Sequence, residues 1–132
     1  MDNQLFFLVE YNLMPIQKVI RALGHSAFLT YDSEIGLKAD SKDIDIIRHV
    51  VNQKRDLGID RIILTRDSAF AADIGHYSVK IIIMDDNTDR WKISLMQKRE
   101  LVKTIIAEAM RLIQATTGQA IGYVQCSRFY KK

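Results

Sequence analysis

Two short apolar runs in this chain each lead into a carboxylate, the kind of side chain that holds hard divalent cations. Residues 5–9 (LFFLV) are followed by Glu10, and residues 61–65 (RIILT) are followed by Arg66 and Asp67. Apolar runs of this length are typical of strands that are buried on both faces of a parallel sheet. If the two strands are parallel neighbours, both carboxylates lie at the edge where open α/β sheets bind ligands. Carboxylate oxygens gathered there would suit Mg²⁺ or Mn²⁺.

Other carboxylates occupy positions that the same topology brings toward this edge. Asp40 and Asp43 flank Ser41, which opens a predicted helix, and Asp85 and Asp86 follow a later predicted strand. Crowded carboxylates repel one another unless a cation lies between them. One or two such ions could activate water and neutralise the charge that builds on a phosphodiester during in-line attack. Carboxylates at strand ends and in first helical turns are also common without any metal, so spacing alone leaves both interpretations open.

The elements that must position these groups alternate between strands and helices. Helical spacing of apolar residues predicts three main helices, and short apolar runs predict strands between them. The buried stripe of the second helix is expected to include Leu57, and that of the third to include Met110 and Ile113. The order predicts a three-layer α/β/α sandwich around a mostly parallel sheet of four to five strands. The helices are expected at about 15–23, 41–57 and 93–116, and the strands at 5–9, 25–31, 61–65, 79–84 and 120–126.

Length and composition place the chain among single compact domains. It has 132 residues, 48% of them hydrophobic, with one proline and six glycines, which is enough to bury one core without a linker. We expect one domain over 1–132, with a core at about 5–116 and a C-terminal strand and basic tail at 117–132. Three basic residues of that tail account for the whole net charge of +3. The overall charge is therefore weak evidence for a nucleic-acid partner.

Several other classes of protein are disfavoured. Cys126 is the only cysteine, which excludes an internal disulfide or a cysteine-built zinc site and fits a reducing compartment. The N-terminal apolar run is too short for a signal or membrane segment, so we expect a cytoplasmic protein with no membrane partner. The isolated glycines and the lack of a G-x-S-x-G motif argue against a phosphate loop and a serine hydrolase.

Four segments follow one another in an order that resembles one family. They are V-E-Y-N-L-M-P at 9–15, L-G-H at 23–25, A-D-S-K-D-I at 39–44 and L-T-R-D-S-A-F at 64–70. The chain is similar over about residues 5–110 to the PIN-like family, small three-layer α/β domains that include many metal-dependent ribonucleases of toxin and antitoxin systems. The nearest branch has V-D-E-N-L-P, L-x-x-x-G-H, S-D-E-E-I or A-D-D-E-E-L, and T-R-D-x-D-F at these places.

The resemblance implies a metal-dependent ribonuclease whose cofactor is Mg²⁺ or Mn²⁺. Position by position, it implies that Glu10, Asp43 and Asp67 are catalytic and bind the metal directly or through water, and that Asp40 assists. Asn12 would orient water or a ligand. The implied partners are RNA, an antitoxin protein and a second copy of the chain.

Basic residues near the predicted site could bind phosphates. Arg66 adjoins Asp67, and Lys98 and Arg99 belong to a basic stretch over 90–103. Such charges position nucleic acid through its backbone. A solvated helix face is the ordinary alternative for Lys98 and Arg99.

The chain departs from the family pattern at several acidic positions. Glu10 is one methylene longer than the usual aspartate, and Tyr11, Ser41, Lys42 and Ala69 stand where the family has acids. The alternative is therefore a catalytically degenerate PIN-like module that binds nucleic acid or a protein partner. A phosphoacceptor receiver domain also has acids after its first and third strands, but it needs an acidic pair where Tyr11 follows Glu10 and a lysine after a later strand.

Overall fold

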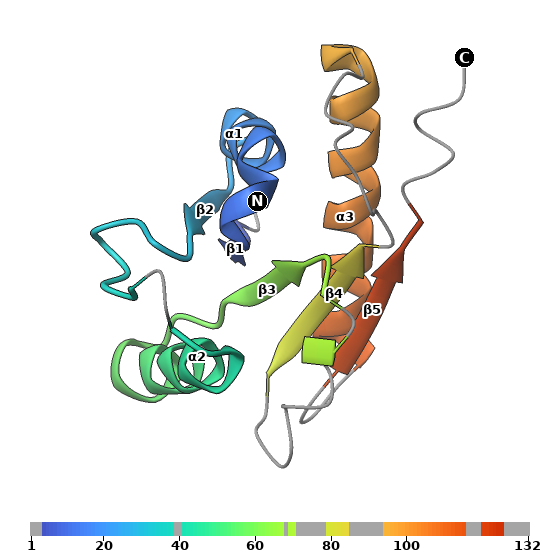
Figure 1. Cartoon of the computed structure of the whole chain (residues 1–132). Coiled ribbons are helices and arrows are strands. Elements are labelled where there is room, and N and C mark those ends of the chain that lie inside the picture. Colours follow the sequence, from blue (N-terminus) through green and yellow to red (C-terminus); the bar gives the residue numbers. More distant parts are fainter. Residues whose placement is uncertain are drawn as a thin grey trace.

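The computed structural model describes residues 4–38, 41–67, 69–70, 79–84, 94–115 and 120–125. Strands and helices alternate along the chain, as the apolar patterns predict. The strands are β1 (Phe6–Val9), β2 (Ser26–Leu29), β3 (Ile62–Thr65), β4 (Lys80–Met84) and β5 (Ala120–Val124). The helices are η1 (Tyr11–Leu13, a 3₁₀ turn), α1 (Met14–Ala22), α2 (Asp43–Leu57) and α3 (Leu95–Ala115) (Figure 1).

The five strands that the structure describes are parallel and form one sheet in the order β2-β1-β3-β4-β5. The chain first moves from β1 to β2 on one side through α1, and then returns through α2 to β3 on the other side of β1. The strand order therefore reverses between β1 and β3. The carboxyl ends of these two strands are neighbours at the point where parallel α/β sheets most often bind ligands.

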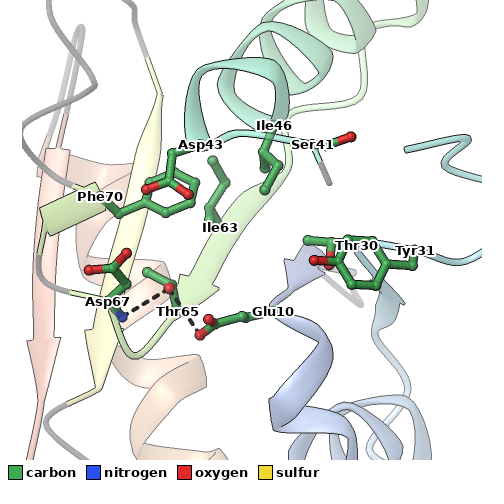
Figure 2. Close-up of a pocket in the computed structure, with 10 residues that line it drawn as sticks. All are labelled: Glu10, Thr30, Tyr31, Ser41, Asp43, Ile46, Ile63, Thr65, Asp67 and Phe70. Carbon is green, nitrogen blue, oxygen red and sulfur yellow. Dashed lines mark hydrogen bonds between the residues drawn. The ribbon is translucent and has the colours of Figure 1, made fainter. Parts of the chain in front are cut away.

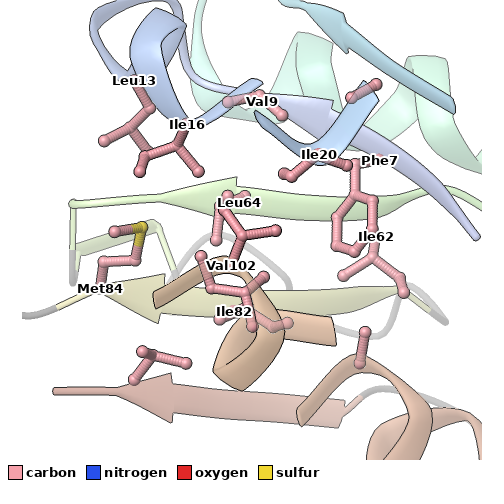
Figure 3. Close-up of a cluster of buried hydrophobic side chains, with 14 of the residues drawn as sticks. Phe7, Val9, Leu13, Ile16, Ile20, Ile62, Leu64, Ile82, Met84 and Val102 are labelled. Carbon is pink, nitrogen blue, oxygen red and sulfur yellow. The ribbon is translucent and has the colours of Figure 1, made fainter. Parts of the chain in front are cut away.

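Helices cover both faces of the sheet, which confirms the predicted three-layer α/β/α architecture. Figure 1 shows α1 and α3 on one face and α2 on the other. On the first face, α1 and α3 pack against alternate strand residues in the core drawn in Figure 3, which includes Phe7, Val9, Ile62, Leu64, Ile82 and Met84. On the second face, α2 packs against the intervening strand residues, which include Leu8, Ile63, Ile81 and Ile83. Side chains of a strand point alternately to the two faces, so each strand contributes to both cores.

The start of α2 differs from the prediction by a small shift. Ser41 was expected to open this helix, but Lys42 is the capping residue and Asp43 is the first helical residue. The Asp45 carboxylate accepts a hydrogen bond from the Lys42 amide at 3.0 Å, which satisfies a donor that the helix itself leaves unpaired. Ser41 lies outside the helix, and its Oγ accepts a bond from the Lys38 amide at 3.0 Å. At the other end, Gly58 ends the helix at φ 71°, as expected for a left-handed cap.

Three residues that were predicted to be buried are exposed. Leu57 is 66% exposed because it is the last residue of α2. Met110 and Ile113 are 37% and 45% exposed. They follow the buried Ala109 and Leu112 by one position each, and one position on a helix turns a side chain by about 100° away from the core. The buried stripe of α3 is therefore narrower on one side than the apolar pattern predicts.

Some predictions lie outside the described residues. These are Asp40, the aspartates at 85 and 86, Cys126 and the basic end of the tail. None of the described helices combines the length and the apolar composition that a membrane span requires.

Candidate functional site

The alternation of side chains along β1 and β3 carries two polar groups to the same face of the sheet. Leu8 and Ile63 are partners in the β1–β3 register and both face α2. Glu10 and Thr65 each follow two positions later, so they continue toward the same face. The Glu10 amide donates to the Leu64 carbonyl at 2.9 Å, which keeps the backbones paired beyond the last residue of β1. The sheet edge and the start of α2 thus enclose a polar space.

A pocket occupies this space, and all three predicted catalytic acids line it. Glu10 comes from the end of β1, Asp67 follows β3, and Asp43 begins α2. Figure 2 shows the three carboxylates together with the rest of the lining, which consists of Thr30, Tyr31, Ser41, Ile46, Ile63, Thr65 and Phe70. The cavity measures about 80 Å³. That volume suits a few water molecules or a hydrated ion, and it is far below the roughly 300–1,000 Å³ of clefts that enclose small-molecule ligands.

Thr65 links two of the acids through its hydroxyl group. Its Oγ1 donates a hydrogen bond to Glu10 Oε1 at 3.1 Å and accepts one from the Asp67 amide at 3.0 Å (Figure 2). Glu10 Oε1 also accepts a bond from the Arg66 amide at 2.9 Å. Thr65 is almost fully buried, and the two bonds that Glu10 Oε1 accepts are partly buried. They hold the Glu10 carboxylate against the end of β3, with Oε2 as its second acceptor oxygen.

Asp67 and Asp43 also have local structural roles. Asp67 is exposed, and its Oδ1 accepts a hydrogen bond from the Ala69 amide at 2.9 Å, a short-range bond of the kind that aspartates make in turns. Asp43 lies in the first turn of α2, where a negative charge interacts favourably with the helix dipole. The Asp67 carboxylate retains acceptor capacity beyond this bond, because an ionised carboxylate has about four lone-pair sites.

The described carboxylates of the pocket are of the type that binds a hard cation, but they do not form a closed set of ligands around one point. Three carboxylates facing one pocket supply the oxygen ligands that Mg²⁺ and Mn²⁺ prefer. Within the described ranges, however, no group of three or more His, Cys, Asp or Glu side chains is arranged to hold a metal ion. An ion here would therefore contact one or two carboxylates and keep part of its water shell, which is the usual state of Mg²⁺ in sites that also bind phosphates.

Of the other residues predicted for the site, those that the structure describes are not among the residues lining this pocket. Asp40 lies outside the described residues. Asn12 is exposed within η1. Arg66 contributes its backbone amide to Glu10, and its side chain is partly buried. Lys98 and Arg99 belong to the first turns of α3, and none of these side chains is among the described lining residues.

Three lining residues were not predicted from the sequence as part of the site. They are Thr65, at the end of β3, and Thr30 and Tyr31, which follow β2. The position of Thr65 two residues after Ile63 indicates a shared face, so strand alternation alone could have identified it. The role of Thr30 and Tyr31 depends on β2 pairing with β1. No pattern within residues 25–31 reveals that pairing.

Comparisons of the chain with models of protein families, with curated proteins and with solved structures found no match.

Proposed function

We propose that this chain is a PIN-like, metal-dependent ribonuclease that hydrolyses phosphodiester bonds of RNA. One observation carries the proposal: Glu10, Asp43 and Asp67, from three different elements, line one pocket at the point where the strand order reverses. These are the same three residues that correspond to acidic positions of the family motifs. The resemblance extends the proposal to a cytoplasmic toxin that has an antitoxin partner and pairs with a second copy of itself.

The residues have separate tasks in this proposal. Glu10 is held through Oε1 by Thr65 and Arg66, so Oε2 is the oxygen offered to a cation or to its water. Asp67 Oδ1 accepts a hydrogen bond from the Ala69 amide, so Asp67 Oδ2 is the oxygen that this residue offers to a cation or to its water. Asp43 adds a third negative charge from the opposite wall, at the start of α2. When bound, Mg²⁺ or Mn²⁺ would supply charge neutralisation and water activation for hydrolysis.

A cleavage assay with charge-neutral variants tests the proposal. Single-stranded RNA is incubated with the protein and Mn²⁺, beside Glu10→Gln, Asp43→Asn and Asp67→Asn. We expect each variant to lower the cleavage rate by roughly 100-fold or more, since even partners of metal ligands contribute about 10–100-fold. Binding of Mn²⁺, followed by calorimetry, should weaken in parallel.

Matched controls make the same chemical change away from the pocket. Asp56→Asn alters an exposed aspartate that pairs with Arg55 near the end of α2, and Glu100→Gln alters an exposed glutamate of α3. Both should cleave like the parent chain. Cleavage that survives all three pocket variants would refute this site as the catalytic centre.

The degenerate module remains a second candidate, because specific observations favour it. No described group of three ligands is arranged for a metal, and Tyr11 and Ala69 stand where the family has acids. This candidate predicts that calorimetry detects no Mn²⁺ binding and that RNA remains intact at every metal concentration, while the chain still binds RNA or a protein. Metal binding that depends on Asp67 would exclude it.

A further inference from the structure

Two exposed tyrosines stack on each other beside the carboxylate pocket. The ring centroids of Tyr11 and Tyr31 are 5.4 Å apart, with 30° between the ring planes. Tyr11 is 49% exposed and Tyr31 is 39% exposed. Aromatic pairs in cores hide most of their area, whereas this pair leaves ring surface open to solvent. Exposed aromatic surface of this kind is available to a planar ligand.

The pairing of β1 with β2 creates the stack. Val9 and Leu29 are register partners at the ends of these strands, and each tyrosine follows its strand end by two residues. The Thr30 amide donates to the Val9 carbonyl at 3.0 Å, which continues the pairing past β2. Neighbouring strands lie about 4.8 Å apart, so side chains at equivalent positions beyond them are at stacking distance.

The backbone under both rings is restrained. Tyr11 is the first residue of η1, which runs directly into α1. Tyr31 precedes Asp32, whose Oδ2 accepts a hydrogen bond from the Leu29 amide at 2.7 Å. The Asp32 carbonyl accepts a further bond from the Ile35 amide at 2.9 Å. A surface held in place before a ligand arrives loses little conformational entropy on binding.

The stack lies next to the groups proposed to act on a phosphodiester. Tyr31 lines the pocket together with Glu10, Asp43 and Asp67, and Figure 2 shows its ring beside Thr30 at the end of the pocket away from Asp67. Tyr11 directly follows Glu10 in the chain. A nucleotide whose base stacks on this pair would have its sugar and phosphate beside the carboxylates.

We infer that Tyr11 and Tyr31 form a stacking platform for an unpaired base of single-stranded RNA, adjacent to the carboxylate pocket. The inference rests on the proposed function for the choice of RNA as the ligand. It adds that the bound RNA is single-stranded. Every base has a flat face, so the platform selects unpaired nucleotides with little preference among the four bases. Duplex RNA keeps its bases stacked inside the helix and does not supply one.

Binding without cleavage tests the platform. Anisotropy of a labelled single-stranded RNA of about ten nucleotides is measured in EDTA and again in Ca²⁺, at low salt because phosphate contacts weaken as salt rises. Tyr11→Leu and Tyr31→Leu should each weaken binding by roughly tenfold, the usual scale for the loss of one base–aromatic stack. Tyr11→Phe and Tyr31→Phe keep a ring and should bind like the parent chain.

Two controls separate stacking from general effects. Tyr123→Leu removes a tyrosine on β5 that is 66% exposed and should leave the affinity unchanged. An RNA that carries abasic linkers should bind the parent chain more weakly, and Tyr31→Leu should not weaken it further. Thermal unfolding of each variant checks that the fold is intact.

The outcomes distinguish this inference from the proposed nuclease activity. Equal affinity of the leucine variants and the parent chain, or no RNA binding in either buffer, overturns the platform. Tyrosine-dependent binding together with intact RNA in Mn²⁺ supports the platform and refutes the nuclease. Cleavage whose KM is unchanged in both leucine variants supports the nuclease and overturns the platform.

Discussion

At the scale of residues, one buried hydroxyl organises the acidic edge. Thr65 is 1% exposed and connects Glu10 to the Asp67 amide through two hydrogen bonds. Without it, the Glu10 side chain would keep only the Arg66 amide among its described partners on Oε1. The precision of the pocket therefore depends on a residue that carries no charge and performs no chemistry of its own.

Thr65→Val tests this dependence because valine has a similar shape but no hydroxyl. The variant loses the bond to Glu10 and leaves the Asp67 amide without its acceptor, so we expect a loss of about 1–2 kcal/mol in the free energy of unfolding. Urea denaturation measures it. Thr65→Ser keeps the hydroxyl and should preserve the positions of the acids, so RNA cleavage should fall in the valine variant and not in the serine variant. A valine variant with full stability and activity would contradict this role.

At the scale of elements, a buried arginine joins α2 to the sheet. Arg61, just before β3, is 4% exposed. Its Nε donates to Gln53 Oε1 of α2 at 2.6 Å, and its Nη1 donates to the Phe7 carbonyl of β1 at 3.2 Å. The guanidinium also lies 5.0 Å from the ring centroid of Phe28 on β2. Burial lowers the pKa of Arg61, and these contacts offset part of the cost of removing a cation from water.

Arg61→Lys should destabilise the fold although the charge is kept. A lysine ammonium cannot reach two acceptors in the planar geometry of a guanidinium or stack flat on a ring, so we expect a loss of about 1–3 kcal/mol in the free energy of unfolding. Guanidinium denaturation, followed by circular dichroism, measures the loss. The same change at Arg55, an exposed residue that pairs with its neighbour Asp56, should leave stability unaltered. Equal effects at the two positions would disprove the role of Arg61.

At the scale of the whole molecule, His49 of α2 is expected to make the stability of the fold depend on pH. The Nε2 atom of this α2 residue is buried and has no hydrogen-bond partner among the described residues. Burial and, to a lesser extent, the charge of Arg61 lower the pKa of His49 below its ordinary value of 6.5. The folded state thus disfavours a protonated His49, while the unfolded chain accepts the proton readily.

The free energy of unfolding should therefore fall as the pH drops below about 6.5. Between the folded pKa and 6.5 the unfolded chain binds more protons at this residue, so stability rises with pH in that window and is fully present above it. Denaturation curves at pH 7.5 and 5.5 measure the difference. His49→Gln should remove this part of the pH dependence while retaining the contribution of other groups. An unchanged difference between the two pH values in His49→Gln would refute the assignment.

Much of the architecture could be predicted from local patterns. The apolar runs at Phe6–Val9, Ile62–Thr65 and Lys80–Met84 are short and buried on both faces, and helices alternate with them, so a parallel sheet between helical layers follows from elementary packing. The positions of the carboxylates at the strand ends could also be predicted, because these residues come just after the apolar runs. The outward positions of Met110 and Ile113 could not be predicted in this way, because the width of a buried stripe depends on what the helix packs against.

The sequence by itself determined which groups lie at the carboxyl edge of the sheet. The spacing of apolar residues and the direction of each strand are local properties of the chain. Only the tertiary structure decided which of them meet. The β2-β1-β3 order brings Glu10 against Thr65 and Tyr11 against Tyr31, across separations of 55 and 20 residues. Pairing between distant segments is selected by the packing of both cores at once, and no stretch of the chain contains that information alone.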